Sequence, residues 1–240
     1  MTGAPRRCHT HGVPARPTFT PALFDFLTEL RLHNDRDWFE RNRARYLQDV
    51  RDPMLRFIGD LAPVLKRIAP RLVADPRPVG GSLFRIHRDT RFSADKTPYK
   101  TNVAAHFRHE AGRDVHGPGC YLSLSPEEVD VGGGLWHPEA APLKAIREAL
   151  VASPAAWRRA TGTPAMRRLE WWGESLTRTP RGFPKDHPLD EDLRRKDFAA
   201  GLTLAPKDAL SPRFPERCAE VYRSLAPAMG FLARATGLPW

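Results

Sequence analysis

The sequence has few cysteines and no long apolar run, and these shortages exclude several classes of protein. Cys8, Cys120 and Cys218 are too few for a disulfide framework, and they lack the spacing of zinc ligands. No apolar stretch approaches the roughly 18 residues of a membrane span, and none follows the first arginines as in a secretory leader. We therefore expect a reduced, cytoplasmic, bacterial-type protein with no membrane partner.

The sequence also lacks the short motifs of well-known catalytic and metal sites. H-E-x-x-H, G-x-S-x-G and C-x-x-C are absent, as are the glycine-rich patterns of dinucleotide and P-loop sites. Cys120 falls in a predicted strand and Cys218 on the apolar face of a predicted helix, so neither is expected to be a nucleophile. We predict no metal and no cofactor, and whether the protein is an enzyme stays open.

Lysine is scarce beside arginine. The 240 residues carry a formal net charge of +10, which is typical of proteins that bind nucleic acid, but only 7 of the 38 basic residues are lysine. Such an excess of arginine is also typical of a GC-rich genome. Residues 1–16 hold three arginines and no acid, so the remaining residues carry +7. Binding to a polyanion and a basic surface without a specific partner both remain open.

Hydrophobic spacing predicts an α+β fold. A first helix is expected from Thr20–Pro21 and a second after the N-cap Asn34, with aspartates in its first turn; a third is expected from Pro53. Alternation predicts strands at 82–87, 103–107, 121–124, 129–131, 169–176 and 201–204. Further helices are predicted at 139–152, 153–160 and 189–198 and from Ser211 to Gly237.

Because the helices flank the strands instead of alternating with them, we expect an N-terminal helical layer, a central, mostly antiparallel sheet and C-terminal helices. Residues 1–17 are predicted to be a disordered tail and residues 18–240 a single domain.

The densest chemistry lies in residues 85–100, which hold five cations and two carboxylates. Arginine suits carboxylate and phosphate groups, and surplus positive charge is costly to bury unless an anion arrives. The predicted ligand is a small phosphorylated or carboxylated molecule, with these candidate residues: Arg85, Arg88, Arg91, Lys96 and Lys100 for binding, and Asp89, Asp95 and Tyr99 for catalysis. The alternative is an ion-pair network that joins the helical layer to the sheet without any ligand.

Three glycines, Gly132–Gly134, stand between a predicted strand and a predicted helix. A glycine turn at a helix start can expose N–H groups to an anion, so Gly133 and the nearby His137 join the ligand-binding candidates. The same glycines could instead permit close packing, and His137 could be an ordinary turn residue. Trp171 and Trp172 could stack on a base or fill the core.

The central segment resembles a bacterial protein family. The pattern Arg-x-x-Arg-Asp-x-Arg-Phe, followed by Asp-Lys-x-x-Tyr, is similar to the signature of the family known as domain of unknown function 2461. The matching positions are Arg85, Arg88, Asp89, Arg91, Phe92, Asp95, Lys96 and Tyr99. The resemblance spans about residues 19–235, and it implies membership of a family without implying an activity.

Three hypotheses follow for the function: binding of a small anion, a nucleic-acid-associated module, and a non-catalytic protein in which residues 85–100 are structural. A concave pocket that holds the charged segment would favour the first hypothesis. A broad basic face with exposed tryptophans would favour the second. Burial of the segment without a cavity would favour the third.

Overall fold

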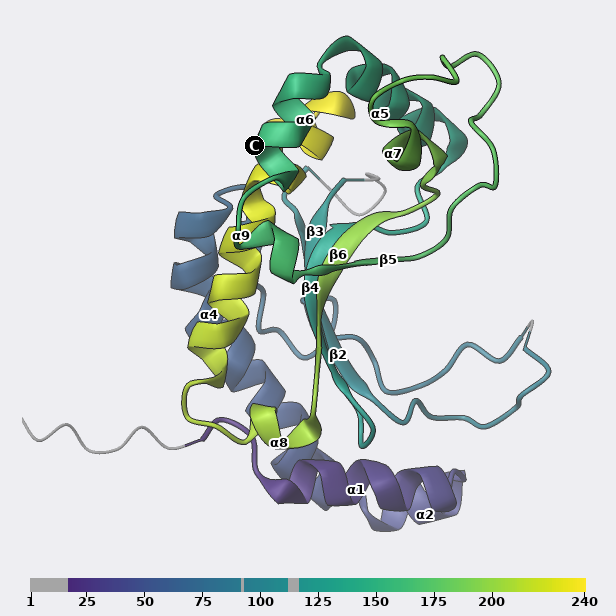
Figure 1. Cartoon of the computed structure of the whole chain (residues 1–240). Coiled ribbons are helices and arrows are strands. Elements are labelled where there is room, and N and C mark those ends of the chain that lie inside the picture. Colours follow the sequence, from purple (N-terminus) through teal and green to yellow (C-terminus); the bar gives the residue numbers. More distant parts are fainter. Residues whose placement is uncertain (1–16, 92, 112–116) are drawn as a thin grey trace, which may run out of the picture.

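The computed structural model describes residues 17–91, 93–111 and 117–240, so residues 1–16 of the predicted tail and Phe92 lie outside the described residues. The fold is mixed α+β, as predicted. Six antiparallel strands form one sheet in the order β1-β2-β3-β4-β6-β5. Helices surround this sheet on one face and at both of its ends (Figure 1).

The elements are bounded as follows. The strands are β1 (Leu72–Val73), β2 (Val103–His109), β3 (Gly119–Leu124), β4 (Val129–Leu135), β5 (Glu170–Trp172) and β6 (Phe198–Leu204). The α-helices are α1 (Pro21–Leu32), α2 (Arg36–Arg41), α3 (Arg43–Arg45), α4 (Asp52–Ile68), α5 (Ala140–Ala152), α6 (Pro154–Thr161), α7 (Asp190–Arg194), α8 (Pro206–Ala209) and α9 (Phe214–Ala235). A π-helical segment, η1 (Tyr46–Arg51), leads into α4, and a 3₁₀ turn, η2 (Met166–Arg168), precedes β5.

The core lies between one face of the sheet and the two longest helices, α4 and α9. Phe107 and Leu122 point from the sheet toward this side, where Tyr222 of α9 is fully buried. The rings of Phe107 and Tyr222 meet at 6.0 Å, and the Tyr222 hydroxyl donates a hydrogen bond to the carbonyl of Tyr121 at 3.1 Å. Burial of these apolar side chains drives the packing of α9 on the sheet.

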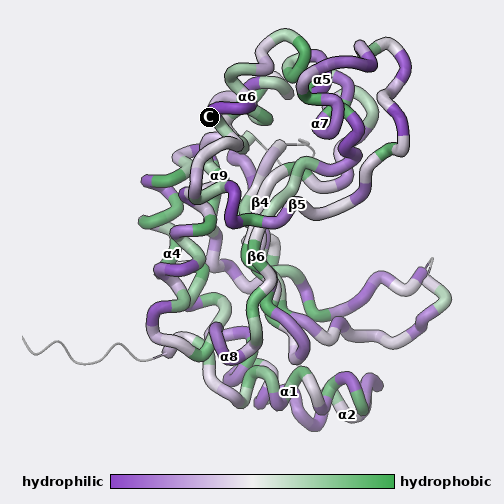
Figure 2. Tube along the Cα trace, viewed as in Figure 1, coloured by the Kyte–Doolittle hydropathy of each residue, from purple (hydrophilic) through white to green (hydrophobic). Residues whose placement is uncertain are grey.

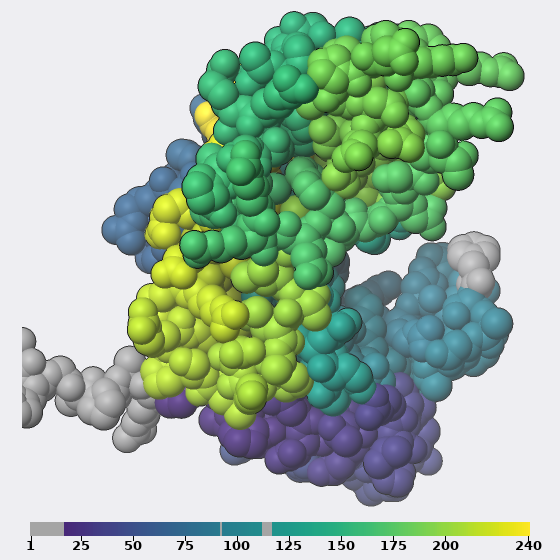
Figure 3. All heavy atoms as spheres, in the orientation of Figure 1, coloured from purple at the N-terminus to yellow at the C-terminus, as the bar shows by residue number. Residues whose placement is uncertain are grey.

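The opposite face of the sheet is bordered rather than covered. Helices α1 and α2 pack at one end of the molecule, and α5, α6 and α7 form a lobe at the other end (Figure 1). A segment made of residues 84–91 and 93–100 projects from the sheet between them (Figure 1), and we call it the arm. Figure 2 shows that the arm is mostly hydrophilic. Figure 3 shows that the surface is hollowed between the arm and the lobe.

Most of the predicted elements are confirmed, but the cap of the second helix is displaced by one residue. Asp35, and not Asn34, caps α2, because its carboxylate accepts a hydrogen bond from the Trp38 N–H at 2.8 Å. Asn34 instead bonds the backbone of Tyr99, donating to its carbonyl and accepting from its N–H, both at 3.0 Å. The side chain of Asn34 thus ties the end of the arm to the helical layer.

The predicted glycine turn at 132–134 is wrong. All three glycines lie inside β4, where Gly133 pairs with Cys120 on one side and Ala200 on the other. Their backbone therefore belongs to the sheet and does not form an exposed loop at a helix start. Glycine carries no side chain, so these three positions do not show the apolar–polar alternation by which a strand is predicted from a sequence.

Two further predictions are corrected in length. The helix predicted at 189–198 is limited to α7, because Arg195 leaves the helical conformation with φ −57° and ψ 139° and Phe198 begins β6. The strand predicted at 82–87 forms only isolated bridges, Leu83 to Ala105 and His87 to Tyr99. The last residues of this predicted strand, 84–87, begin the arm.

Candidate ligand-binding cleft

The arm holds most of the predicted charged residues, and they largely bind one another. Arg88, which is half-buried, forms an ion pair with Asp95 and donates a hydrogen bond to the Thr97 hydroxyl at 2.6 Å. The N–H of Thr97 donates to Asp95 at 2.9 Å. This N–H and the Arg88 guanidinium lower the pKa of Asp95 to about 2. The carboxylate therefore stays ionised and holds the two sides of the arm together.

The outer part of the arm is joined in the same way. Arg91 pairs with Asp89 at 2.7 Å, which lowers the pKa of this carboxyl. The Lys96 ammonium donates to the carbonyl of Thr90 at 2.9 Å. Lys96 and both members of the Arg91–Asp89 pair are exposed. These contacts lie within the arm, and they do not join the helical layer to the sheet.

Tyr99 lies at the base of the arm and is almost fully buried. Its ring stacks on Phe39 of α2 with centroids 4.1 Å apart and lies 5.1 Å from the His87 ring. Burial raises the pKa of its hydroxyl. The ring is thus an anchor between the arm and the helical layer, away from the cleft described next.

A cleft of about 840 Å³ opens on the face of the sheet opposite the core. The side chains and backbone that line it come from the base of the arm and from β2, β3, β4, β5 and β6: Phe84, Lys100, Asn102, Ala104, His106, Arg108, His109, Gly117, Gly119, Tyr121, Asp130, Gly133, Gly134, Leu135, Trp136, Trp172, Ala199 and Thr203. Two of the predicted site residues, Lys100 and Gly133, are among them.

Lys100 brings a cation into the cleft with no acid beside it. Its ammonium lies 5.1 Å from the centre of the Phe84 ring, and no carboxylate of the described residues forms an ion pair with it. Burial lowers the pKa of this ammonium, and the positive charge of the exposed Arg85 lowers it further. A half-buried cation in this environment gains stability from any anion that approaches it.

Several polar side chains surround the Phe84 ring, at the end of the cleft where Lys100 lies. The guanidinium carbon of Arg108 lies 6.0 Å from its centre, and the His106 and Tyr121 rings lie 6.3 Å and 6.5 Å away. Cation–π attraction holds the cations against the ring without neutralising them. Their charge therefore remains available to a ligand.

His106 is a neutral histidine at ordinary pH. Burial and, less strongly, the charge of Arg108 lower its pKa from 6.5 to about 4. Arg108 donates its Nε–H to Nδ1 of the ring at 3.2 Å, so the ring proton sits on Nε2. Nε2 faces Gly119, where an added Cβ would lie 2.4 Å from it. The glycine leaves the room that this N–H donor needs.

His137 lies beside the cleft, next to the exposed lining residue Trp136. Its N–H donates to Asp197 at 2.7 Å, and its Nδ1 lies 3.1 Å from the same carboxylate oxygen. Asp197 is buried and also accepts from the Glu174 N–H at 3.1 Å. The carboxylate holds His137 in a left-handed conformation, φ 46°, that side chains rarely adopt.

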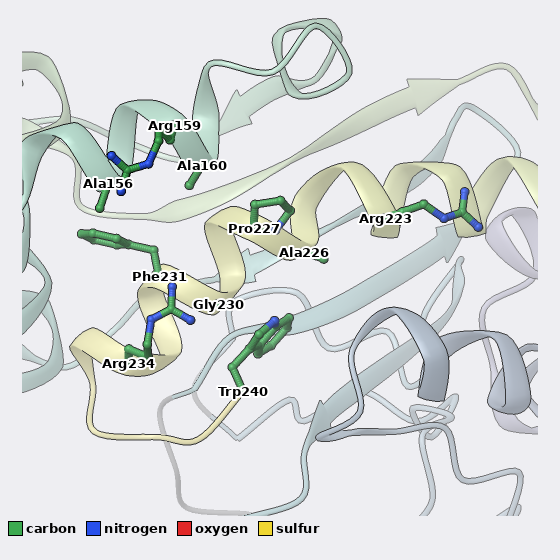
Figure 4. A pocket seen from close by; sticks show the side chains of 10 residues that line it. All are labelled: Ala156, Arg159, Ala160, Arg223, Ala226, Pro227, Gly230, Phe231, Arg234 and Trp240. Carbon is green, nitrogen blue, oxygen red and sulfur yellow. The ribbon is translucent and has the colours of Figure 1, made fainter.

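A second, smaller cavity of about 470 Å³ lies between α6 and α9 (Figure 4). Arg159, Arg223 and Arg234 border it, and the Trp240 ring is seated on Gly230, where an added Cβ would lie 2.8 Å from the indole. None of the residues predicted from the sequence lines this groove.

Most residues that line the cleft were not predicted from the sequence. His106 and Arg108 occupy alternate positions of β2 and so share the face away from the core, and Asn102, which directly precedes the strand, also lines the cleft. Polar residues at alternate positions of an otherwise apolar strand were the signal that could have revealed His106 and Arg108. Of the two adjacent tryptophans, Trp172 lines the cleft, whereas Trp171 contacts the buried Trp157 at 5.8 Å.

Among residues 17–91, 93–111 and 117–240, no group of three histidine, cysteine or acidic side chains is placed to hold a metal ion. None of the helices in these ranges is both long and apolar enough to cross a membrane. Cys120 and Cys218 are buried, and burial raises the pKa of both thiols.

These features define an α+β protein with a cationic, aromatic cleft on the open face of its sheet. The chain belongs to the conserved hypothetical protein family DUF2461, whose model matches residues 22–231. This match confirms the resemblance seen in the sequence. No curated protein and no solved structure matches the chain.

Proposed function

We propose that this cytoplasmic protein binds a small phosphorylated or carboxylated molecule in the cleft, with the anionic group between Lys100 and Arg108. The observation that carries the proposal is the half-buried Lys100 ammonium, which lies over the Phe84 ring and forms no ion pair with an acid of the described residues. A ligand anion would remove the cost of holding this charge away from water.

The other polar groups suit the same ligand. Asp130 is the one carboxylate among the described residues that line the cleft, and Lys100 and Arg108 are the two cations among those residues. The neutral His106 adds an N–H donor. Two cations and neutral donors around an aromatic wall match the chemistry by which small anionic molecules are usually held.

The charged residues of the outer arm would then support the site, which Phe84 and Lys100 at the base of the arm help to form. Arg88, Asp89, Arg91 and Asp95 have partners within the arm, and Tyr99 anchors its base. Arg85 is exposed and adds to the positive potential at Lys100.

A thermal-shift screen tests the proposal. The panel would hold inorganic phosphate and phosphorylated and carboxylated metabolites, each measured with the wild type, Lys100→Met and Lys96→Met. Lys96 is the matched control because it lies outside the cleft and its ammonium donates to the Thr90 carbonyl of the exposed arm. A compound at about a hundred times its Kd should raise the melting temperature of the wild type by roughly 5–10 °C.

The same compound should raise the melting temperature of Lys96→Met equally and that of Lys100→Met much less. The proposal is wrong if no compound stabilises the wild type, or if Lys100→Met is stabilised as strongly as the wild type.

The second candidate, binding to nucleic acid, is favoured by the groove between α6 and α9. Its three arginines are exposed, and no acid of the described residues pairs with them. If an oligonucleotide binds there, log affinity should fall with log salt at about −0.9 per phosphate contacted on a duplex. Absence of binding near 100 mM salt, or a flat response to salt, would exclude this candidate.

A further inference from the structure

Trp172 lies against two glycines that face each other on neighbouring strands. Gly132 of β4 pairs with Gly201 of β6. A Cβ added at Gly132 would lie 2.3 Å from Cη2 of the Trp172 indole, and one added at Gly201 would lie 2.4 Å from the same atom. Any side chain at either position would push the indole off the sheet.

The glycines therefore form a floor that leaves room for the indole. The six-membered end of the ring, with Cζ2, Cη2 and Cζ3, lies against β4 and β6, and Trp172 is only half-buried and lines the cleft. The indole thus adds an aromatic surface to the cleft. Aromatic side chains presented in this way are used to stack flat rings, because every base or arene has a π-face.

An acceptor adjoins this surface. Asp130 lies two residues before Gly132 on β4, so both lie on the same face of the sheet at a spacing of roughly 7 Å, and Asp130 lines the cleft. The Thr203 hydroxyl donates to the Asp130 carboxylate at 2.8 Å, which leaves other lone pairs of the carboxylate for a ligand. A ring or sugar with N–H or O–H donors would satisfy them.

From these three features we infer that the ligand is a flat-ring phosphate, of which a nucleoside monophosphate is the type. Its ring stacks on Trp172, its donors bond Asp130, and its phosphate lies between Lys100 and Arg108. The inference rests on the proposed function, and it adds that the anionic ligand carries a flat ring.

Matched ligand pairs separate the ring from the anion. The pairs are each of the four common nucleoside monophosphates against ribose 5-phosphate, and phenyl phosphate against glycerol 3-phosphate. Calorimetric titration would give each Kd for the wild type, Trp172→Leu, Trp172→Phe and Lys100→Met. Circular dichroism and the melting temperature without ligand would show that each variant is folded.

In the wild type, at least one ring-bearing phosphate should bind about tenfold more tightly than its ring-free partner. Trp172→Leu should reduce this ratio to near one, and Trp172→Phe should retain most of it because phenylalanine restores a π-face. Lys100→Met should weaken both members of a pair.

Three results would overturn the inference. If ring-bearing and ring-free phosphates bind equally and the binding of both depends on Lys100, the inferred stacking of a ring on Trp172 is wrong and the proposed function stands. If no phosphate binds with dependence on Lys100, both are wrong. If only an oligonucleotide binds, with a steep dependence on salt, the occupant is a nucleic acid strand and not a small molecule.

Discussion

The lowered pKa of His106 predicts how the free energy of unfolding depends on pH. In the unfolded chain this histidine titrates near its ordinary pKa of 6.5, whereas in the fold burial and Arg108 lower the pKa to about 4. The unfolded state therefore takes up the proton first as the pH falls. The stability that depends on a neutral His106 is complete above about pH 6.5 and is lost as the pH falls toward 4.

The two pKa values give the magnitude. Between pH 8 and pH 5, proton linkage at this one group should lower the free energy of unfolding by about 2 kcal/mol. The variant His106→Gln keeps a polar side chain but has no proton to gain. Its free energy of unfolding should be lower than that of the wild type at pH 8, and the difference should shrink by about 2 kcal/mol at pH 5.

Urea denaturation at pH 8, 7, 6 and 5 measures both proteins under the same conditions. The comparison cancels the carboxyl groups, which titrate alike in the two chains. A constant difference between wild type and variant across this range would show that His106 keeps an ordinary pKa, and the account of Arg108 as its donor would fail.

Three further predictions concern the frame of the site. Asn34→Ala should cost about 1–3 kcal/mol in urea denaturation, because the Tyr99 N–H and carbonyl lose their partners; an unchanged midpoint would contradict the anchoring role. Gly201→Ala should destabilise the fold and change the fluorescence spectrum of Trp172, because the new Cβ meets the indole at 2.4 Å; a wild-type spectrum and midpoint would refute the glycine floor. Arg88→Ala should lower the melting temperature measurably, whereas Lys96→Ala should leave it unchanged, since only Arg88 is half-buried and ion-paired; equal effects would count against the network in the arm.

Long amphipathic helices were predictable from the sequence. Helix α4 repeats Leu61 and Leu65 on one face, and α9 repeats Cys218, Tyr222 and Leu225, so burial of one stripe defines each helix. The hairpin of β3 and β4 was predictable for a similar reason, because apolar residues alternate along it. These patterns involve residues that are close together in the chain, so they can be recognised in a single sequence.

The candidate site was only partly predictable. Five cations and two carboxylates in residues 85–100 leave a surplus of positive charge, but composition does not show which cation is unpaired. Arg88 pairs with Asp95 seven positions away. Lys100 differs because it follows the last acid of the segment and enters the cleft. Sequence reasoning could place it in the cluster but could not show that it lacks a partner.

The glycine floor under the Trp172 indole could not be predicted at all. Trp172, Gly132 and Gly201 come from three strands, and they meet only through the register of β4 on β6 and β5 on β6. A one-residue change of register would send the glycines to the other face. Sequence spacing carries no information about that register over such distances.

The most direct test of the central claim is the titration of the Lys100 ammonium itself. The chain has seven lysines, so ¹³C-labelling at lysine Cε with Lys100→Met as the assignment control resolves the signal by NMR. In the free protein, Lys100 should titrate below the exposed lysines, because burial and Arg85 lower its pKa. Saturation with the most stabilising phosphorylated compound should raise that pKa, because the bound anion favours the charged form. A Lys100 signal that titrates like the exposed lysines and does not respond to the compound would contradict the account.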